Sequence, residues 1–371
     1  MDMSAWDRPA GRHMGIQAVT AGLATLTLVA CADPTGSVSN RDLLAECSIA
    51  NTQIADGGPG KDGIPALTDP PTVGPADPGT EYLLEDDRVV GIELDGEPLA
   101  IPLNIFWWHE IVNLDTDGGA VAVTHCPLTG SSLAFDRAAI GGGEFGVSGL
   151  LYRNNLMMYD RTNQESLWPQ MSRGARCGPR DGATLEMVPV IETTWSGWQS
   201  LHPDTRVVSS ATGHARDYTE YPYGNYDELD NDAILFPMPE PDRRRPLKER
   251  TLGIATEAGG IGFPFGALDE LGPLAAVHVD TSGEEIVVFW DRSRQSAMAY
   301  HPVVDDGQRL GFQVEDGRLV DTATGSTWRV DGRATDGPLA GSRLPPVAEA
   351  YVAFWFAWAG FHPEAELWEA S

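Results

Sequence analysis

Basic residues are scarce in this chain of 371 amino acids. Lysine and arginine together number 25 against 54 aspartates and glutamates, which gives a formal net charge of −29. A surface of this sign repels the phosphate backbones of nucleic acids, so we expect no nucleic-acid partner. The acidity is instead typical of a highly soluble protein.

Long apolar runs are also lacking. A helix that crosses a bilayer needs roughly 20 apolar residues, and two prominent apolar stretches, 16–30 and 351–359, are shorter. The first follows a positively charged segment, so we interpret residues 1–30 as a signal peptide rather than a membrane span. The second is interpreted below as part of a core helix.

The signal peptide ends in Leu28-Val29-Ala30-Cys31, which resembles a bacterial lipobox. This motif predicts cleavage before Cys31 and attachment of a lipid to its sulfur. An ordinary secretory signal followed by a chance cysteine is the alternative. Under both interpretations the mature protein lies outside the cytoplasm. Under the first it is a lipoprotein anchored to a membrane, on the periplasmic or the cell-surface face.

Cysteine is rare, with four residues in the chain. If Cys31 carries a lipid, Cys47, Cys126 and Cys177 remain. An odd number in an oxidising compartment leaves one thiol over. Cys47 and Cys177 lie in loop-like segments and can form a disulfide, which would leave Cys126 free. The alternative is that all three are free thiols.

Glycine and proline, in contrast, are abundant, with 41 and 27 residues. They favour many short strands and turns over long helices. Residues 31–80 are interpreted as a polar tether followed by a Pro/Gly-rich entry segment. Beyond them, the apolar runs 89–94 and 99–103 flank Asp95-Gly96, the signature of a β-hairpin.

An internal repeat organises the rest of the chain. Residues 89–208 align with residues 251–368 in a constant order with small gaps, as expected for two copies of one domain. We therefore divide the chain into a first β-rich copy, 81–208, an aromatic and Pro-rich connection, 209–250, and a second, degenerate copy, 251–371. The matched segments include Val90-Gly91-Ile92 with Leu252-Gly253-Ile254, Val121-Ala122-Val123 with Ile286-Val287-Val288, and Ser166-Leu167-Trp168 with Ser326-Thr327-Trp328.

Each copy is predicted to end in a short helix that carries two tryptophans. Trp195 and Trp198 in the first copy, like Trp355 and Trp358 in the second, are three residues apart and share one helix face. A His-Pro pair follows each helix and ends it, because the residue before proline disfavours the α conformation. The expected fold is mainly β with a minor α+β character, in two tandem copies that are each closed by one such helix.

Positions kept in both copies are interpreted as scaffold, whereas polar side chains found in one copy only are candidates for function. Two of these candidates lie at a turn between apolar strands, where rigid neighbours can present a reactive group. The candidates are His109, Glu110, His125 and Cys126, which align with Leu271, Gly272, Trp290 and Asp291 of the second copy.

These motifs also resemble a known family, the prokaryotic domain of unknown function 3179, over roughly residues 57–371. The resemblance implies no established reaction. Family members often carry Cys-Pro-Leu-Cys-Gly at the turn, and here Thr129 replaces the second cysteine, so no internal partner thiol is present. The similar segments are Lys61–Leu67, Trp108–Asn113, Val123–Ser131, Phe145–Tyr152 and Phe354–Trp358.

Three activities remain open for the turn. The preferred prediction is thiol redox chemistry, in which Cys126 has a lowered pKa near His109 and His125, with Glu110 as a further candidate catalytic residue. A second is a copper or zinc site with His109, His125 and Cys126 as ligands. A third is a non-catalytic binding or structural module that uses the cleft of the first copy and its aromatic side chains.

Overall fold

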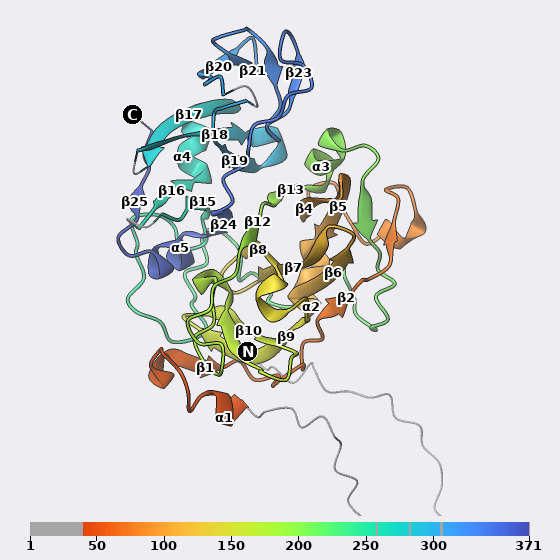
Figure 1. The fold of residues 1–371 in the computed structure, drawn as a ribbon, viewed down its shortest axis with the longest axis vertical. Coiled ribbons are helices and arrows are strands. Elements are labelled where there is room, and N and C mark those ends of the chain that lie inside the picture. Colours follow the sequence, from red (N-terminus) through yellow and green to blue (C-terminus); the bar gives the residue numbers. More distant parts are fainter. Residues whose placement is uncertain (1–39, 257–258, 282, 305–306, 371) are drawn as a thin grey trace, which may run out of the picture. The chain divides into compact units, whose positions relative to one another are not determined.

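Strands dominate the residues that the structure, a computed structural model, describes: 40–256, 259–281, 283–304 and 307–370. Figure 1 shows many short strands joined by turns and a few short helices. The prediction of a mainly β fold is confirmed. The predicted signal peptide, 1–30, and Cys31 lie outside the described residues. Among those described, no helix is both long and apolar enough to span a membrane.

The first half of the fold opens with the predicted hairpin. β4 (Arg88–Leu94) pairs antiparallel with β5 (Glu97–Pro102). Asp95 and Gly96 join them with φ angles of 51° and 83°. Positive φ at both positions is the type I′ turn that matches the twist of a two-residue hairpin, and Asp-Gly adopts it readily. The hairpin prediction is therefore confirmed.

The order of elements in the first half recurs in the second half. In both, a strand pair is followed by a short helix and three antiparallel strands. In the first half these are α2 (Leu103–His109), β6 (Ile111–Thr116), β7 (Gly119–Cys126) and β8 (Ser131–Asp136). In the second half the pair and its followers are β15 (Arg250–Ile254), β16 (Ile261–Pro264), α4 (Phe265–Glu270), β17 (Leu274–Thr281), β18 (Glu284–Asp291) and β19 (Ser296–Tyr300).

Each half then continues into a smaller sheet of its own. The first contains β1 (Ile54–Asp56), β9 (Phe145–Tyr152), β10 (Asn155–Asp160) and β11 (Leu167–Pro169). The second contains β20 (Phe312–Glu315), β21 (Arg318–Asp321), β22 (Thr327–Trp328) and β23 (Ala334–Asp336). The entry segment and its surroundings add α1 (Asn40–Leu43), β2 (Leu67–Thr68), β3 (Thr72–Val73) and β12 (Met187–Val188).

A strand, a short helix and a further strand end each half. They are β13 (Ile191–Thr194), α3 (Trp195–Leu201) and β14 (Arg206–Val208) in the first half, and β24 (Ala350–Phe354), α5 (Trp355–Phe361) and β25 (Glu366–Leu367) in the second. The last strand pairs parallel with the hairpin of its own half, β14 with β5 and β25 with β16.

The predicted tryptophan helices are present as α3 and α5. Trp198 lies over Gly91, and Trp358 lies over Gly253. A Cβ added to either glycine would come within 2.2 Å of the indole, so both positions require glycine. The histidine after each helix has its ring 4.1 Å and 4.0 Å from that tryptophan, centroid to centroid, which supports a packing role for both.

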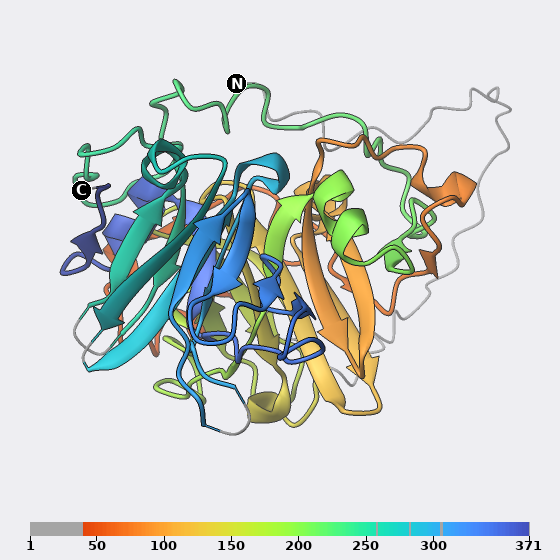
Figure 2. The same ribbon diagram turned by 90° about the horizontal axis from the view of Figure 1, so that it is seen from above.

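Strands from both halves share one sheet. Its order is β2-β6-β7-β8-β24-β15-β16-β25, and the halves meet where Ser132 of β8 pairs with Val352 of β24. Figure 1 labels β8 of the first half next to β24 of the second, and Figure 2 shows the same strands from above. One apolar core cluster accordingly contains buried residues of both, such as Phe135 and Trp358. The turn after β7 therefore lies at the junction of the halves.

A disulfide joins Cys47 to Cys177, the pair that the cysteine count singles out. It ties the entry segment to the first half of the fold. Cys126 is a free thiol and is buried.

Candidate functional site

The two reactive residues of the turn point away from each other. β7 ends at Cys126, β8 begins at Ser131, and the ladder pairs His125 with Ser132 and Cys126 with Ser131. Because neighbouring residues on a strand face opposite sides of the sheet, the imidazole of His125 and the thiol of Cys126 have separate surroundings. The turn thus presents two distinct environments rather than one site.

The thiol of Cys126 is fully buried. Its Sγ donates to the carbonyl of Asn154 at 3.7 Å and accepts from the amide of Leu156 at 3.3 Å. Burial, followed by the charge of Glu110, raises the pKa of Cys126 to about 11. The predicted lowering of this pKa is wrong, because burial of the sulfur disfavours the charged thiolate. A protonated, enclosed thiol is unreactive.

Glu110 has an unusual backbone that directs its side chain toward Cys126. It follows α2 with φ of 56°, in the left-handed region that a non-glycine residue rarely occupies. Its carboxyl interacts electrostatically with Cys126 and Tyr223, not with His125. Burial raises the pKa of Glu110 to about 8, and within the described part of the chain its carboxyl has no hydrogen bond or ion pair.

His109 is held in place by both of its ring nitrogens. Nδ1 lies 2.7 Å from the carbonyl of Pro65, to which it must donate, and Nε2 lies 2.8 Å from the Tyr218 hydroxyl, from which it accepts. Burial lowers the pKa of His109 to about 4. This neutral imidazole links the entry segment to the connection, and neither nitrogen is available to Cys126. The predicted catalytic role of His109 is therefore not supported by its geometry.

The predicted copper or zinc site is not assembled. Each of its three proposed ligands, His109, His125 and Cys126, has its own neighbours, as described above and below. Among residues 40–256, 259–281, 283–304 and 307–370, no group of three or more His, Cys, Asp or Glu side chains is placed to hold a metal ion. Opposite-facing side chains on β7 and the engaged nitrogens of His109 explain why this prediction is wrong.

His125 begins a chain of hydrogen bonds that fixes its tautomer. Its Nδ1 lies 2.9 Å from Ser132 Oγ, and Ser132 Oγ donates its only proton to Glu192 Oε2 at 2.6 Å. Ser132 must therefore accept from Nδ1–H, so Nε2 of His125 carries a lone pair. Burial lowers the pKa of His125 to about 3. Its imidazole is thus neutral at ordinary pH, and Nε2 has no hydrogen-bond partner among the described residues.

Glu192 also accepts hydrogen bonds from two guanidiniums, one from each half of the molecule. Its Oε1 accepts from Arg88 Nε at 2.7 Å and from Arg250 Nη1 at 2.9 Å. Burial alone would raise the pKa of Glu192, but the two arginines lower it to about 2. Arg88 and Arg250 occupy matching positions at the starts of β4 and β15. The cluster is buried and carries two positive charges against one negative charge.

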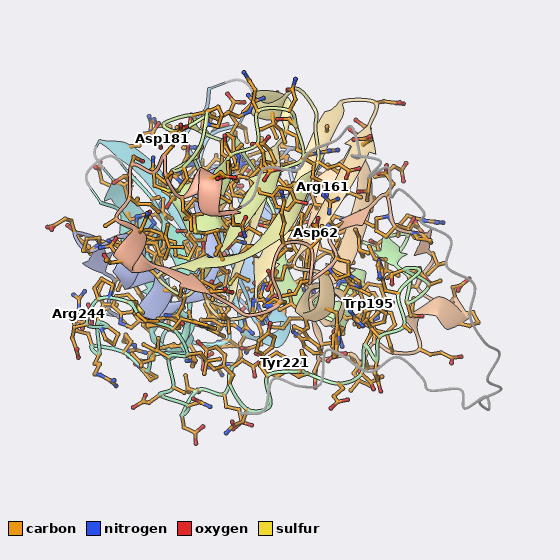
Figure 3. All side chains as sticks on the ribbon, turned by 90° about the horizontal axis from the view of Figure 1, so that it is seen from below. Asp62, Arg161, Asp181, Trp195, Tyr221 and Arg244 are labelled. Atoms are coloured by element: carbon orange, nitrogen blue, oxygen red, sulfur yellow. A yellow bond between two sulfur atoms is a disulfide. The ribbon has the colours of Figure 1, made fainter. Side chains whose placement is uncertain are left out.

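A cavity of about 290 Å³ opens onto this cluster. We call it the junction pocket. Tyr221, labelled in Figure 3, lies on the connection, and its ring meets Trp107 edge-on with centroids 5.0 Å apart. Apolar rings with a few polar groups are typical of a small-molecule site. The pocket is lined by Asp86, Asp87, Arg88, Leu103, Trp107, His125, Pro127, Gly130, Tyr221, Asp227, Arg250 and Phe354.

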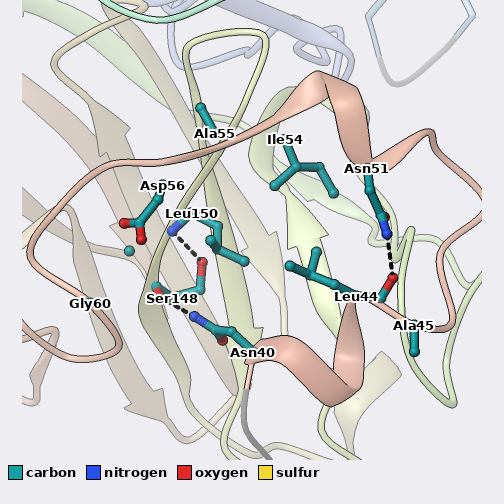
Figure 4. Close-up of a pocket in the computed structure, with 11 residues that line it drawn as sticks. Asn40, Leu44, Ala45, Asn51, Ile54, Ala55, Asp56, Gly60, Ser148 and Leu150 are labelled. Carbon is teal, nitrogen blue, oxygen red and sulfur yellow. Dashed lines mark hydrogen bonds between the residues drawn. The ribbon is translucent and has the colours of Figure 1, made fainter.

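A larger cavity of about 540 Å³ lies near the start of the described chain (Figure 4). Asn40 Nδ2 donates to the carbonyl of Ser148, and Asn51 Nδ2 donates to that of Leu44, both at 2.9 Å. Of its lining residues, Asp56 alone carries a charge. The junction pocket is the better functional candidate despite its smaller volume. It is lined by two arginines and by His125, whose Nε2 has no hydrogen-bond partner among the described residues.

Ser132 and Glu192 were missed by the sequence analysis, although the same rule selects them. Ser132 pairs with His125 as Ala297 pairs with Trp290. Glu192 pairs with Val90 as Val352 pairs with Leu252. Both are therefore polar in one half and apolar in the other. Applying the rule to every aligned position, rather than to the motifs around the turn, would have found them.

Arg88 and Arg250 escape the rule for the opposite reason. They are kept in both halves, so the rule assigns them to the scaffold. Their shared acceptor, Glu192, lies in the first half only, and no local pattern in the sequence indicates that the two arginines meet there.

The family described as "Protein of unknown function (DUF3179)" matches residues 61–365 of the chain. No curated protein and no solved structure shows a significant match.

Proposed function

Because the chain belongs to the DUF3179 family, whose description records no function, we propose an activity from its own geometry: it binds a small polar ligand in the junction pocket. The observation that carries this proposal is the fixed tautomer of His125. Ser132 and Glu192 hold Nδ1–H, which leaves Nε2 of His125, a residue that lines the cavity, as a hydrogen-bond acceptor. Such an acceptor, oriented before the ligand arrives, gives affinity with little ordering on binding.

The low basicity of His125 favours a role in ligand binding over a role in acid–base catalysis. A general base works best when its pKa lies near the operating pH. With a pKa of about 3, His125 takes up protons poorly at neutral pH, whereas it remains a good neutral acceptor. The thiol of Cys126 lies on the other side of β7 and is protonated, so it does not take part.

The guanidiniums supply the complementary donors. Each arginine uses part of its fork on Glu192, and both line the pocket. Arginine presents five N–H donors in a fixed fork, so donors remain for a ligand oxygen. A ligand with an acceptor oxygen and a neighbouring donor group satisfies both walls.

The junction pocket is best explained if the fold arose by duplication of one domain. Support comes from the recurring order of elements, from Trp198 over Gly91 and Trp358 over Gly253, and from parallel pairing of the last strand with the hairpin of its half. On this proposal the second copy lost the polar residues and now completes the pocket with Arg250 and Phe354.

We place the protein outside the cytoplasm, anchored to a membrane through a lipid on Cys31. The lipobox-like sequence before Cys31 supports this, and so does the disulfide between Cys47 and Cys177, because disulfides persist in oxidising compartments. Incorporation of labelled fatty acid into the wild-type protein but not into Cys31→Ala tests the anchor. Equal labelling of both proteins would contradict it.

A thermal-shift screen of small polar compounds against the full chain, followed by calorimetric titration, tests ligand binding. His125→Phe keeps an aromatic ring but removes the acceptor, and we expect it to weaken binding by about 10-fold, the value of one hydrogen bond. His301→Phe, outside the pocket, is the control and should not change the affinity. If no compound binds, or if every bound compound is indifferent to His125→Phe, the proposal is wrong.

A further inference from the structure

Two of the residues that line the junction pocket, Arg88 and Arg250, are basic, and we call them its floor. Arg88 and Arg250 are largely buried, with side chains 13% and 19% exposed, and share the single carboxylate of Glu192. No other acidic side chain among the described residues forms an ion pair with either arginine. The floor therefore keeps one uncompensated positive charge beside the neutral imidazole of His125. Buried charge without a partner is unfavourable, so a ligand carboxylate is stabilised there.

Three other residues that line the pocket are acidic, and we call them its rim. They are Asp86, Asp87 and Asp227, of which Asp86 is exposed and the other two are half-buried. Asp87 Oδ2 accepts from the amide of Leu84 at 2.8 Å and from Asn104 Nδ2 at 3.2 Å. No arginine or lysine in the described part of the chain forms an ion pair with these three carboxylates, although Lys248 interacts electrostatically with Asp227. A purely anionic ligand would be repelled by the carboxylates.

We infer that the ligand is a small zwitterion, an α-amino acid, which matches both poles of the pocket. This inference rests on the proposed ligand-binding function. The carboxylate would lie against the guanidiniums of Arg88 and Arg250. The ammonium group would donate to Nε2 of His125 and face Asp227. The side chain would pack on the rings of Trp107 and Tyr221.

The fixed tautomer of His125 selects the ammonium group. Nε2 can only accept a hydrogen bond, and an ammonium group only donates. An aromatic wall also attracts a cation through the ring faces. A hydroxy acid provides a donor to His125 but no positive charge for the rim, and a simple amine leaves the charge of the floor unpaired. The α-amino acid is the class that satisfies both ends at once.

Three matched probes test this with the full chain by calorimetric titration. L-Phenylalanine has both charged groups, L-3-phenyllactate replaces the ammonium by a hydroxyl, and phenethylamine lacks the carboxylate. We expect phenylalanine to bind at least about 10-fold tighter than either analogue, the equivalent of one charge-assisted hydrogen bond. Comparable or tighter binding of phenyllactate or phenethylamine would overturn the inference.

Asp227→Asn sharpens the result, because Asp227 lines the rim and is only half-buried. It should weaken phenylalanine and phenethylamine about equally and leave phenyllactate unchanged or slightly tighter. A uniform effect on all three would contradict the assignment of the ammonium to the rim. If none of the three probes binds while other compounds of the screen bind in a His125-dependent way, the amino-acid inference is wrong but the proposed ligand binding is supported. If no compound binds at all, both the inference and the proposed function are wrong.

Discussion

The two halves of the molecule have the same order of elements but different side chains at the turn after β7 and the end of β18. Both place a tryptophan over a glycine of the hairpin. At the end of β7 the first half has His125 and Cys126. At the end of β18, in the same register, the second half has Trp290 and Asp291. The tryptophan–glycine contacts that both halves share pack the fold, whereas three polar residues found in the first half only, His125, Ser132 and Glu192, form the hydrogen-bonded chain at the junction pocket.

In the second half the matching position is filled by packed side chains. Trp290 is buried against Phe265, with ring centroids 5.0 Å apart. Asp291 accepts from the amides of Ser293 and Arg294 and caps a short 3-10 turn. An indole and a capping carboxylate make this turn a packed end of a sheet. In the first half, the smaller imidazole of His125 borders a cavity.

Glu192→Val gives the first half the residue of the second half and has the largest expected effect. Arg88 and Arg250 would remain buried without a counter-charge. Removal of one partner of a buried pair costs about 3–5 kcal/mol, and we expect a loss of this size in the free energy of unfolding by urea at pH 7. Val352→Ala, at the matching position, should cost about 1–2 kcal/mol. A loss for Glu192→Val no larger than this control would contradict the role of the cluster.

The pH dependence of the stability that Glu192 contributes gives a second check. Its pKa lies near 2, below the ordinary value of 4.5. Its stabilising effect is therefore fully present above pH 4.5 and is lost as the pH falls toward 2. The difference in stability between wild type and Glu192→Val should narrow over that range.

Gly91→Ala and Gly253→Ala test the shared scaffold and have the next largest effect. In each, the new Cβ would collide with an indole at 2.2 Å. Overpacking of this kind costs about 1–3 kcal/mol, and the two losses should agree within about 1 kcal/mol in urea unfolding. Gly74→Ala is the control, because nothing lies within 4 Å of its added Cβ. Clearly unequal losses would show that the halves do not share this contact.

Glu110→Gly has a smaller, pH-dependent effect. The aligned residue of the second half is Gly272, which also has a positive φ, 124° against 56° for Glu110. Because burial raises the pKa of Glu110 from 4.5 to about 8, the wild type loses stability as the pH rises through this range. The free energy of unfolding of the variant, relative to that of the wild type, should increase by about 1 kcal/mol between pH 6 and pH 7. A constant difference between their urea unfolding free energies at the two pH values would contradict a buried carboxyl.

The sequence was sufficient for many of the strands, the hairpin and the two tryptophan helices because their signals are local. The helices α2 and α4 were not predicted. Alternating apolar residues, Asp95-Gly96 and paired tryptophans each specify a conformation within a few residues. The turn itself was also found, since a histidine and a cysteine between two apolar strands stand out.

The chemistry of the turn could not be predicted because it depends on distant residues and on side-chain direction. The partner of Ser132 is Glu192, 60 residues away. Strand geometry separates His125 from Cys126, which could have been foreseen, but the left-handed backbone of Glu110 has no signature in its neighbours. The pKa shifts of His125 and Cys126 are caused mainly by burial, which depends on the whole fold.

Cys126 offers the smallest expected effect and the sharpest contrast with the original thiol hypothesis. The sulfur is fully buried and its pKa is raised to about 11, so at pH 8 little thiolate forms and none is accessible. We expect iodoacetamide to leave Cys126 unmodified in the native full chain and to alkylate it in guanidinium chloride, as read by mass spectrometry of its peptide. Cys126→Ala should lower stability by only about 1 kcal/mol and leave ligand binding unchanged. Native alkylation as fast as that of the unfolded chain would instead make the sulfur side of the turn an exposed site, and the division between a packed thiol and a ligand-facing imidazole would fail.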